Sequence, residues 1–285
     1  MTLAELRQRL REQLAGGESP ALDADVLLCH VLGKPQSFLL AWPEYRPTPA
    51  EQEQLAALVA RRRRGEPVAH LTGRREFWSL ELEVSSATLI PRPDTELMVE
   101  AALARLPARP ATLADLGTGT GAIALALKSE RPADRVLAVE FSPQAAALAR
   151  RNSARLVLAI EVRQGSWFEP LAGLYFDMIL SNPPYIDAAD PHLQSGDVRF
   201  EPASALVAEQ AGLADLHHIV EMARAYLNAG GWLLLEHGWQ QGSQMREYFD
   251  AMGYCLVQTL RDYGGQERLT LGQWPGRQDA ENQGQ

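Results

Sequence analysis

The chain has 285 residues, of which 46% are hydrophobic and 22% charged, and its formal net charge is -9. This length allows a large core and two domains, and the composition is typical of a globular protein. The acidic balance disfavours broad nucleic-acid binding, which needs a basic surface, and no apolar run approaches the ~20 residues that span a bilayer.

The N-terminal segment and the two cysteines bear on where in the cell the protein is expected to work. Residues 1–14 are charged throughout and lack the apolar centre of a signal peptide. The two cysteines, Cys29 and Cys255, lie far apart and show no metal-ligand spacing. We therefore expect a cytoplasmic protein with no membrane contact, no metal and no disulfide.

Residues 1–73 are predicted to form a small helical domain. Leucines at helical spacing indicate its first helix, and Asp23 or Asp25 is expected to begin a second one that Gly33 ends. Thr48 is expected to cap a further helix, because proline follows it and glutamate stands three residues on. The domain carries no catalytic signature, so we expect it to recognise a partner.

Four consecutive arginines, Arg61 to Arg64, stand at the end of the last of these helices. Cations suit the carboxyl end of a helix dipole, so a solvated helix end explains the run. An RNA contact is the alternative. We favour the solvated end because the rest of the chain is acidic.

The next segment, 74–90, alternates in part between apolar and polar residues and is predicted to be a β-hairpin linker. Residues 91–275 then alternate strands and helices, which predicts an α/β domain with a doubly wound, mainly parallel sheet. In its first helix Asp94 or Thr95 is the expected cap. The polar tail, 276–285, is expected to be disordered.

A glycine loop, Gly117-Thr118-Gly119-Thr120-Gly121, lies between a predicted strand over 112–116 and a predicted helix over 122–128. Glycine permits positive φ and lets backbone N–H groups approach a ligand. Glu140 ends the next predicted strand, where an acidic side chain can bind ribose hydroxyls. The pattern predicts a cofactor that contains a nucleoside.

The nature of this cofactor depends on the neighbouring residues. With Ala122 the loop also fits G-x-G-x-x-A, so a nicotinamide cofactor must be considered. Asp115 lies just before the loop, placed to meet an ammonium group rather than a pyrophosphate. This favours S-adenosylmethionine, and Glu140 disfavours a bare structural turn.

A second motif, Asn182-Pro183-Pro184-Tyr185, follows the predicted strand 177–180. Asn182 offers an amide oxygen as acceptor, and the two prolines fix the backbone and remove two donors. Tyr185 adds a flat ring, although it could also be a half-buried packing residue. Together these residues predict a rigid slot for a planar NH2 group at the carboxyl end of a strand.

Several segments taken together resemble a known family, the bacterial glutamine N5-methyltransferases of the HemK/PrmC type, which modify peptide chain release factors. The resemblance covers nearly the whole chain. It rests on residues 65–73, Ile90-Pro91-Arg92-Pro93-Asp94-Thr95-Glu96, the stretch from Asp115 to Gly121, Asn182 to Ile186, residues 196–202 and Leu235-Glu236-His237-Gly238. The Asn-Pro-Pro-Tyr motif alone is less specific, since amino-methyltransferases of nucleic acids share it.

The resemblance implies a Rossmann-like class I methyltransferase domain, S-adenosylmethionine as cofactor and a class 1 release factor as substrate. Its target is the glutamine of the release factor's Gly-Gly-Gln loop, in support of translation termination. Residues 117–121 would line the methionine part of the cofactor, Glu140 would meet the ribose and Trp167 would flank the adenine. Asn182 to Tyr185 would hold the glutamine amide.

One residue departs from the family pattern. Ser166 stands where relatives carry an acidic residue suited to the adenine amino group, so we expect somewhat weaker adenine binding. Arg199 and Glu201 are expected either to pair within a loop or to touch the substrate protein. His217-His218 is predicted to lie on a helix surface, His237 to be structural and Trp239 to be buried in the core.

The mechanism implied is an in-line methyl transfer to an amide nitrogen. We expect the Asn182 side-chain oxygen and the Pro183 carbonyl to accept both amide hydrogens, with Tyr185 stacked on the amide plane. The alternatives are an adenine N6-type methyltransferase of nucleic acid and a non-catalytic binding protein. Gly264-Gly265-Gln266 spells the substrate triplet, and a tight turn is expected there rather than self-methylation.

Overall fold

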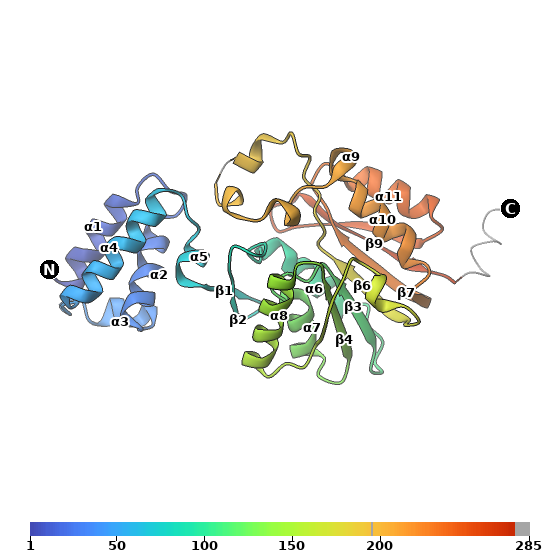
Figure 1. Ribbon diagram of the computed structural model, residues 1–285, viewed down its shortest axis with the longest axis horizontal. Helices are drawn as coiled ribbons and strands as arrows, with labels where there is room; N and C mark the ends of the chain where they lie inside the picture. The colour runs from blue at the N-terminus through green and yellow to red at the C-terminus, as the bar shows by residue number, and fades with distance from the viewer. Residues whose placement is uncertain (195, 277–285) are drawn as a thin grey trace. The chain divides into compact units, whose positions relative to one another are not determined.

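The computed structural model describes residues 1–194 and 196–276, which form two compact units. The first unit comprises Met1–Arg74 together with Gln194–Phe200, and the second comprises Arg75–Leu193 and the chain from Glu201 onward. Figure 1 shows both units and labels most of their helices and strands. From residue 277 on, the tail expected to be disordered lies outside the described residues.

The first unit is helical, as the leucine pattern predicted. Its core consists of buried leucines from the helices, such as Leu3, Leu27 and Leu55. At Thr48 the predicted cap is confirmed, because its side chain accepts from the Glu51 N–H and Glu51 accepts from the Thr48 N–H at 2.6 Å. The helices are α1 (Leu3–Gln13), α2 (Pro20–Leu32), α3 (Gln36–Ala41), α4 (Pro49–Arg63) and α5 (Val68–Thr72).

The start of α2 corrects one expectation. The helix begins at Pro20, after Ser19, and not at Asp23 or Asp25. Proline is preorganised for the first helical position, so the helix starts one turn early. Both aspartates lie inside α2 and are buried, and Asp25 accepts from the Arg7 Nε at 2.5 Å. Their charge serves ion pairs between helices rather than a cap.

The arginine run at the end of α4 is only partly solvated. The Arg62 Nε donates to Asp23 at 2.7 Å, and its Nη1 lies 3.2 Å from Asp197. Arg61 pairs with Glu66, whereas Arg63 and Arg64 are exposed. The expectation of a solvated helix end is therefore wrong for Arg62, whose two acidic partners stand far away in the sequence.

The predicted hairpin is present but short. It consists of β1 (Arg74–Phe77) and β2 (Leu80–Glu83), while residues 84–90 are not strand. Trp78 and Ser79 both have positive φ, 51° and 57°, as the tightest hairpin turns require. Phe77 is buried in the core of the second unit, so the hairpin packs as part of that unit.

A seven-stranded sheet forms the centre of the second unit, in the order β5-β4-β3-β6-β7-β9-β8. The first five strands in this order pair in parallel, and β9 pairs antiparallel with β7 and β8. This confirms the predicted Rossmann-like fold. The strands are β3 (Thr112–Leu116), β4 (Arg135–Glu140), β5 (Glu161–Gln164), β6 (Phe176–Ser181), β7 (Leu227–Glu236), β8 (Cys255–Arg261) and β9 (Glu267–Trp274). We did not anticipate β8, an edge strand of mixed composition.

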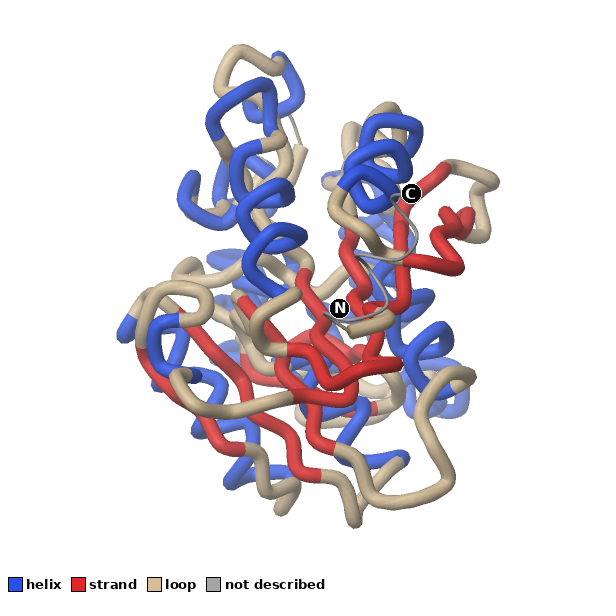
Figure 2. The backbone as a smooth tube through the Cα atoms, turned by 90° about the vertical axis from the view of Figure 1, so that its right-hand side faces the viewer, coloured by secondary structure: helices blue, strands red, loops and turns tan. Residues whose placement is uncertain are grey.

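Helices cover both faces of this sheet, so side chains of one strand alternate between two cores. In β6, for example, Met178 and Leu180 belong to one core and Ile179 to the other. Figure 2 traces the strands in red and the helices in blue. The first face carries α6 (Glu96–Leu103), α7 (Ala122–Glu130) and α8 (Pro143–Leu156), and the second carries α10 (Ala214–Ala223) and α11 (Gly242–Ala251). Shorter helical segments are η1 (Pro93–Thr95), η2 (Glu169–Leu171), η3 (Pro191–Gln194), η4 (Val198–Phe200), η5 (Ala203–Ala205) and α9 (Glu209–Gly212).

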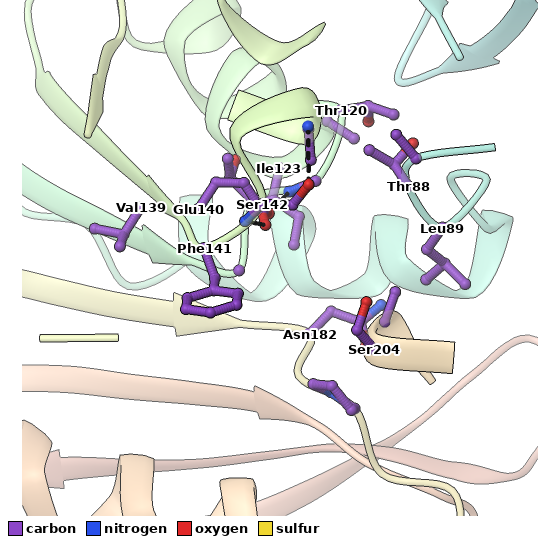
Figure 3. Close-up of a pocket in the computed structure, with 18 of the residues that line it drawn as sticks. Thr88, Leu89, Thr120, Ile123, Val139, Glu140, Phe141, Ser142, Asn182 and Ser204 are labelled. Carbon is purple, nitrogen blue, oxygen red and sulfur yellow. Dashed lines mark hydrogen bonds between the residues drawn. The ribbon is translucent and has the colours of Figure 1, made fainter. Parts of the chain in front are cut away.

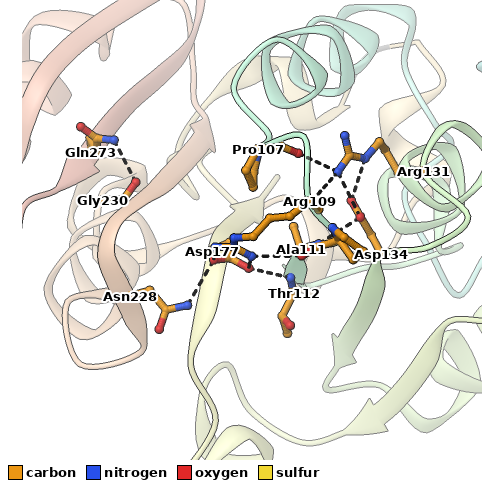
Figure 4. A network of polar contacts seen from close by, with 11 residues as sticks. Pro107, Arg109, Ala111, Thr112, Arg131, Asp134, Asp177, Asn228, Gly230 and Gln273 are labelled. Atoms are coloured by element: carbon orange, nitrogen blue, oxygen red, sulfur yellow. Dashed lines mark hydrogen bonds and ion pairs between the residues drawn. The ribbon is translucent and has the colours of Figure 1, made fainter.

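Polar contacts hold the amino edge of the sheet (Figure 4). Asp177 accepts from the Arg109 guanidinium at 2.6 Å and from the Thr112 N–H at 2.8 Å, and it thereby joins β6 to β3. The buried Asp134 accepts from the Ala111 N–H at 3.0 Å. In the part of the chain that the structure describes, no helix is long and apolar enough to cross a membrane.

Candidate active site

A cavity of about 320 Å³ lies at the carboxyl ends of β3, β4 and β6 (Figure 3). In the sheet β3 stands between β4 and β6, which makes this the switch point where open α/β sheets bind ligands. The cavity is lined by Phe77, Ala87, Thr88, Leu89, Pro91, Arg92, Thr95, Gly117, Thr118, Gly119, Thr120, Ala122, Ile123, Val139, Glu140, Phe141, Ser142, Ala145, Gly165, Ser166, Trp167, Asn182, Pro184, Ser204, Ala205 and Asp215. All of them belong to the second unit.

The glycine loop forms the floor of this cavity after β3. Gly117, Gly119 and Gly121 have φ of 71°, 56° and 86°, a conformation that side chains other than glycine rarely adopt. A Cβ added to Gly117 would lie 3.4 Å from the ring of Trp167. The loop therefore needs glycine both for its backbone and for the space above it.

Asp115 lies beneath the loop and is 1% exposed. Its Oδ2 accepts from the Thr118 hydroxyl at 2.5 Å, whereas Oδ1 has no hydrogen-bond partner among the residues described. Burial raises the pKa of Asp115 to about 7, although the Thr118 hydroxyl and the Ala124 N–H lower it in part. A buried carboxylate is costly, and a cation bound at the loop would stabilise its charge.

Glu140 ends β4 on the cavity wall. Its two oxygens accept from the Gly119 N–H at 2.9 Å and from the Ser142 N–H at 2.8 Å. Each carboxylate oxygen has a second lone pair, so both can still accept from the hydroxyls of a ribose. Phe141 also lines the cavity and is 73% exposed. Sequence reasoning missed it, although an aromatic residue directly after Glu140 was a usable signal.

Ser166 and Trp167, which follow β5, both line the cavity. Trp167 has a positive φ of 43°, which is uncommon outside glycine. Asp215, in the first turn of α10, lines the same cavity, and burial raises its pKa. Asp215 could not be selected from the sequence, because only the fold brings α10 to this place.

The Asn-Pro-Pro-Tyr motif follows β6 directly. Ser181 closes that strand and donates to the Leu116 carbonyl at 2.7 Å, which fixes where the motif begins. Asn182 lines the cavity, and its Nδ2 donates to the Thr95 hydroxyl at 3.3 Å. Pro183 is buried and Pro184 lines the cavity. The structure thus brings the motif and the glycine loop to one cavity.

Glu236 ends β7 beside this motif. Its Oε2 accepts from the Thr95 hydroxyl at 2.7 Å, and its Oε1 accepts from the Tyr185 hydroxyl at 3.4 Å. Burial raises the pKa of Glu236 to about 7. Burial and the neighbouring Glu236 also raise the pKa of Tyr185, so its hydroxyl stays protonated and donates. Thr95 occupies the N-cap position of α6, as one of the two expected caps, but its side chain makes no capping hydrogen bond.

The two loop residues expected to pair or to touch substrate have separate partners. Glu201 accepts from the Ile90 N–H at 3.1 Å and from the Arg92 guanidinium at 2.7 Å. Arg199 belongs to the first unit, where it donates to the Arg64 carbonyl at 3.0 Å. Among the other predicted residues, Asp115, Gly121, Pro183 and Tyr185 support the cavity rather than line it.

Other sequence expectations have mixed outcomes. His237 is buried, and its Nε2 lies 2.8 Å from the Thr270 hydroxyl, as a structural histidine would. Trp239 was expected in the core but is 54% exposed. Within the described chain no group of metal-binding side chains occurs. Gly265 has a φ of 82° in a turn before β9, which confirms the turn predicted there.

The strand order, with a glycine loop at its switch point, defines a Rossmann-like fold, and the family matches given below make the chain a methyltransferase. Solved structures with this fold include a methyltransferase from Pyrococcus furiosus (TM-score 0.54, 19% identity, 81% of this chain and 100% of that one). Another is a T. thermophilus 16S rRNA N2 G1207 methyltransferase in complex with AdoMet and guanosine (TM-score 0.51, 21%, 72% and 50%). The family described as Methyltransferase small domain matches residues 93–210, and that described as PrmC N-terminal domain matches residues 3–73.

Curated relatives identify the particular family. The release factor glutamine methyltransferase of Escherichia coli is 58% identical over 274 residues, which cover 95% of this chain and 99% of that protein. The one from Pseudomonas aeruginosa is 58% identical over 264 residues, 92% and 95% of the two chains. The chain therefore belongs to the release factor glutamine methyltransferase family, as the sequence resemblance predicted.

Proposed function

We propose that this enzyme transfers a methyl group from S-adenosylmethionine to the side-chain amide nitrogen of a glutamine. The substrate is the Gly-Gly-Gln loop of class 1 peptide chain release factors in the cytoplasm. The observation that carries this proposal is the position of Asn182. Its amide lies in the same cavity as the glycine loop, so an acceptor for an NH2 group meets a candidate cofactor site.

The cavity fits this cofactor. Asp115, buried directly before the loop, would attract the ammonium of its methionine part by charge, and the glycines at 117, 119 and 121 leave room for that part at the loop. Glu140 would accept from the ribose hydroxyls and Trp167 would flank the adenine. Ser166 would accept one hydrogen bond at the adenine end. Bound there, the sulfonium supplies a methyl group that needs no acid catalyst to leave.

The residues after β6 would orient the glutamine. The Asn182 side-chain oxygen and the Pro183 carbonyl would accept the two amide hydrogens, which favours positive charge developing on the nitrogen. Tyr185 would stack on the amide plane, with Pro184 beside it. A methylated amide nitrogen is very acidic and loses its proton to water, so the reaction does not require a strong base.

Recognition of the release factor is assigned to the helical region, residues 1–73, with 74–90 as linker and 91–275 as the catalytic domain. The helical region carries no catalytic residues, and its family match ends at residue 73. Arg199 and Glu201 are proposed to help hold the substrate protein. Glu201 would act through Arg92, which lines the cavity.

One transfer experiment tests the proposal. Purified enzyme with labelled S-adenosylmethionine is offered to release factor, DNA and RNA in separate reactions. Label in release factor, lost when the glutamine of its Gly-Gly-Gln loop is replaced, supports the proposal. Label in DNA or RNA would instead support an adenine N6-type activity, and label in none of them would support a binding protein.

A further inference from the structure

We infer that Thr95 and Glu236 are positioning residues that set which end of the Asn182 amide faces the substrate. This inference deepens the proposed function, because it matters for turnover only if Asn182 receives the glutamine. It concerns two side chains in different elements. Thr95 precedes α6, and Glu236 ends β7, more than 140 residues later.

The strand register brings these residues together. In the parallel pair of β6 and β7, Ser181 stands opposite Leu235. One residue further along, Asn182 follows β6 and Glu236 ends β7. The Glu236 carboxylate therefore lies beside the start of the Asn-Pro-Pro-Tyr motif. Thr95, at the end of η1, bridges them: it is 2.7 Å from Glu236 and 3.3 Å from the Asn182 Nδ2.

The direction of these hydrogen bonds follows from chemistry. Above its pKa of about 7 Glu236 is ionised and only accepts, so the single hydroxyl proton of Thr95 is then donated to Glu236. The Thr95 oxygen then has lone pairs alone to offer, and the Asn182 end that it binds must be the NH2 group. The Asn182 Oδ1 is thereby directed away from Thr95 and left to accept from the substrate.

Glu236 also holds the other end of the motif. Its second oxygen accepts from the Tyr185 hydroxyl at 3.4 Å, and the Glu236 residue as a whole is 4% exposed. Both of its partners are hydroxyl groups, and each can donate to one oxygen of the ionised carboxylate. The buried Glu236 carboxylate thus holds Tyr185 by a direct hydrogen bond and holds Asn182 indirectly, through Thr95.

The test compares variants that alter polarity at constant shape. Glu236→Gln can donate to Thr95, which frees the hydroxyl proton for the Asn182 oxygen and turns the amide around. Thr95→Val removes the bridge, and Thr95→Ser keeps it. We expect kcat to fall about 10²-fold in the Gln and Val variants, as for a misplaced reacting group. The Ser variant should stay within about 3-fold of the wild type, and the cofactor Kd should be unchanged in all three.

The thermal midpoint separates positioning from folding. A buried charge is removed in Glu236→Gln, so we expect its Tm to be equal or higher while kcat falls. Asp134→Asn is the matched control: this buried carboxylate pairs with the Arg131 guanidinium at 3.1 Å at the amino edge of the sheet, so the change breaks an ion pair and should lower Tm without changing kcat. A kcat within about 3-fold of wild type in both Glu236→Gln and Thr95→Val would overturn the inference.

A spectroscopic measurement is independent of turnover. The side-chain amide resonances of Asn182, assigned by their loss in Asn182→Ala, should shift in Thr95→Val and return in Thr95→Ser. Unchanged resonances in Thr95→Val and Glu236→Gln would refute the inference even if the wild type modified no release factor. Absence of transfer by wild type, with the resonances shifting as expected, would refute the proposed function alone.

Discussion

Asp115 and Glu236 are two buried carboxylates at the same edge of the sheet, and their surroundings differ. Asp115 lies near the end of β3 and keeps one oxygen without a partner among the described residues, whereas Glu236 accepts from two hydroxyls. Burial raises the pKa of both to about 7. The two carboxylates are thus equally buried, but only Glu236 has a hydrogen-bond partner for each of its oxygens.

The difference distinguishes a residue that awaits a ligand from one that organises its neighbours. Asp115 stands directly before the loop that lines the cavity and has no ion-pair partner among the described residues, so we expect its charge to govern cofactor affinity. Glu236 is satisfied within the protein, so it should govern the geometry of the Asn182 loop and hence turnover. Binding and turnover variants should therefore fall on opposite sides of the cavity.

The largest effect is expected at Asn182. Asn182→Ala removes the side-chain acceptor at the cavity, and turnover should fall about 10²–10³-fold, as when one preorganised group of a transition-state site is lost. Cofactor affinity should stay nearly unchanged. Single-turnover methylation of release factor measures the first quantity and calorimetric titration the second.

A matched amide provides the control. Asn228 donates to Asp177 at the amino edge of the sheet, and Asn228→Ala should leave both quantities unchanged. Near-normal turnover in Asn182→Ala would contradict the assignment of turnover to the Asn-Pro-Pro-Tyr motif, because Asn182 would then not act on the substrate.

On the other side, Asp115→Asn should weaken cofactor binding about 10–100-fold, since a charged hydrogen bond is worth about 1.5–3 kcal/mol. Its turnover at saturating cofactor should change less. Titration with S-adenosylhomocysteine, which carries the same ammonium, measures the affinity. A larger loss in kcat than in affinity would contradict the assigned role.

The same carboxylate predicts a pH dependence. The pKa of Asp115 in the free protein is about 7, so ligand binding must displace a proton at lower pH. Affinity should be full above pH 7 and about tenfold weaker at pH 6, and this decline should be absent in Asp115→Asn. Stability of the free protein has the opposite trend: the raised pKa favours the folded state at acidic pH, and this contribution is lost as pH rises through 7.

The sequence predicted the glycine loop and the Asn-Pro-Pro-Tyr motif because both are local patterns at strand ends. Glu140 followed from its spacing after the loop. The sequence could not predict the pairing of Thr95 with Glu236, which depends on the register of β6 against β7. Asp215 was missed for the same reason, since α10 reaches the cavity only through the fold.

Errors in the local predictions have a common cause as well. Asp23 looked like a helix cap because it is acidic and precedes an apolar stretch, but it pairs with Arg62 from another helix. Trp239 looked like a core residue from its type alone and is largely exposed. In both cases a partner or a surface defined by tertiary structure outweighed the preference of the residue.

A smaller effect should arise from the backbone of the glycine loop. Gly117→Ala places a Cβ at positive φ, which costs about 1–2 kcal/mol, and this atom would face the Trp167 ring at 3.4 Å. We expect a lower Tm. We also expect cofactor affinity to weaken by about 3–10-fold, which corresponds to a loss of about 0.7–1.4 kcal/mol of binding free energy. Thermal unfolding with and without cofactor measures both.

Gly33 offers the matched control for that variant. It has a similar φ of 61°, ends α2, and would place a Cβ with nothing within 4 Å. Gly33→Ala should lower stability by a similar amount without changing affinity. If both variants weaken cofactor binding equally, the effect would reflect general destabilisation and not the space above Gly117.

The smallest effect concerns the adenine end, where Ser166 departs from the family pattern. An acidic side chain would accept a stronger hydrogen bond from the adenine amino group, so Ser166→Asp should tighten binding. Asp215 lines the same cavity and its pKa is already raised by burial, so repulsion between two carboxylates should limit the gain to about 3-fold. Ser166→Ala removes the serine hydroxyl without adding a charge and should weaken binding slightly.

The gain in Ser166→Asp should grow when Asp215→Asn is added. Equal affinities in the single and double variants would show that the two carboxylates do not interact across the cavity.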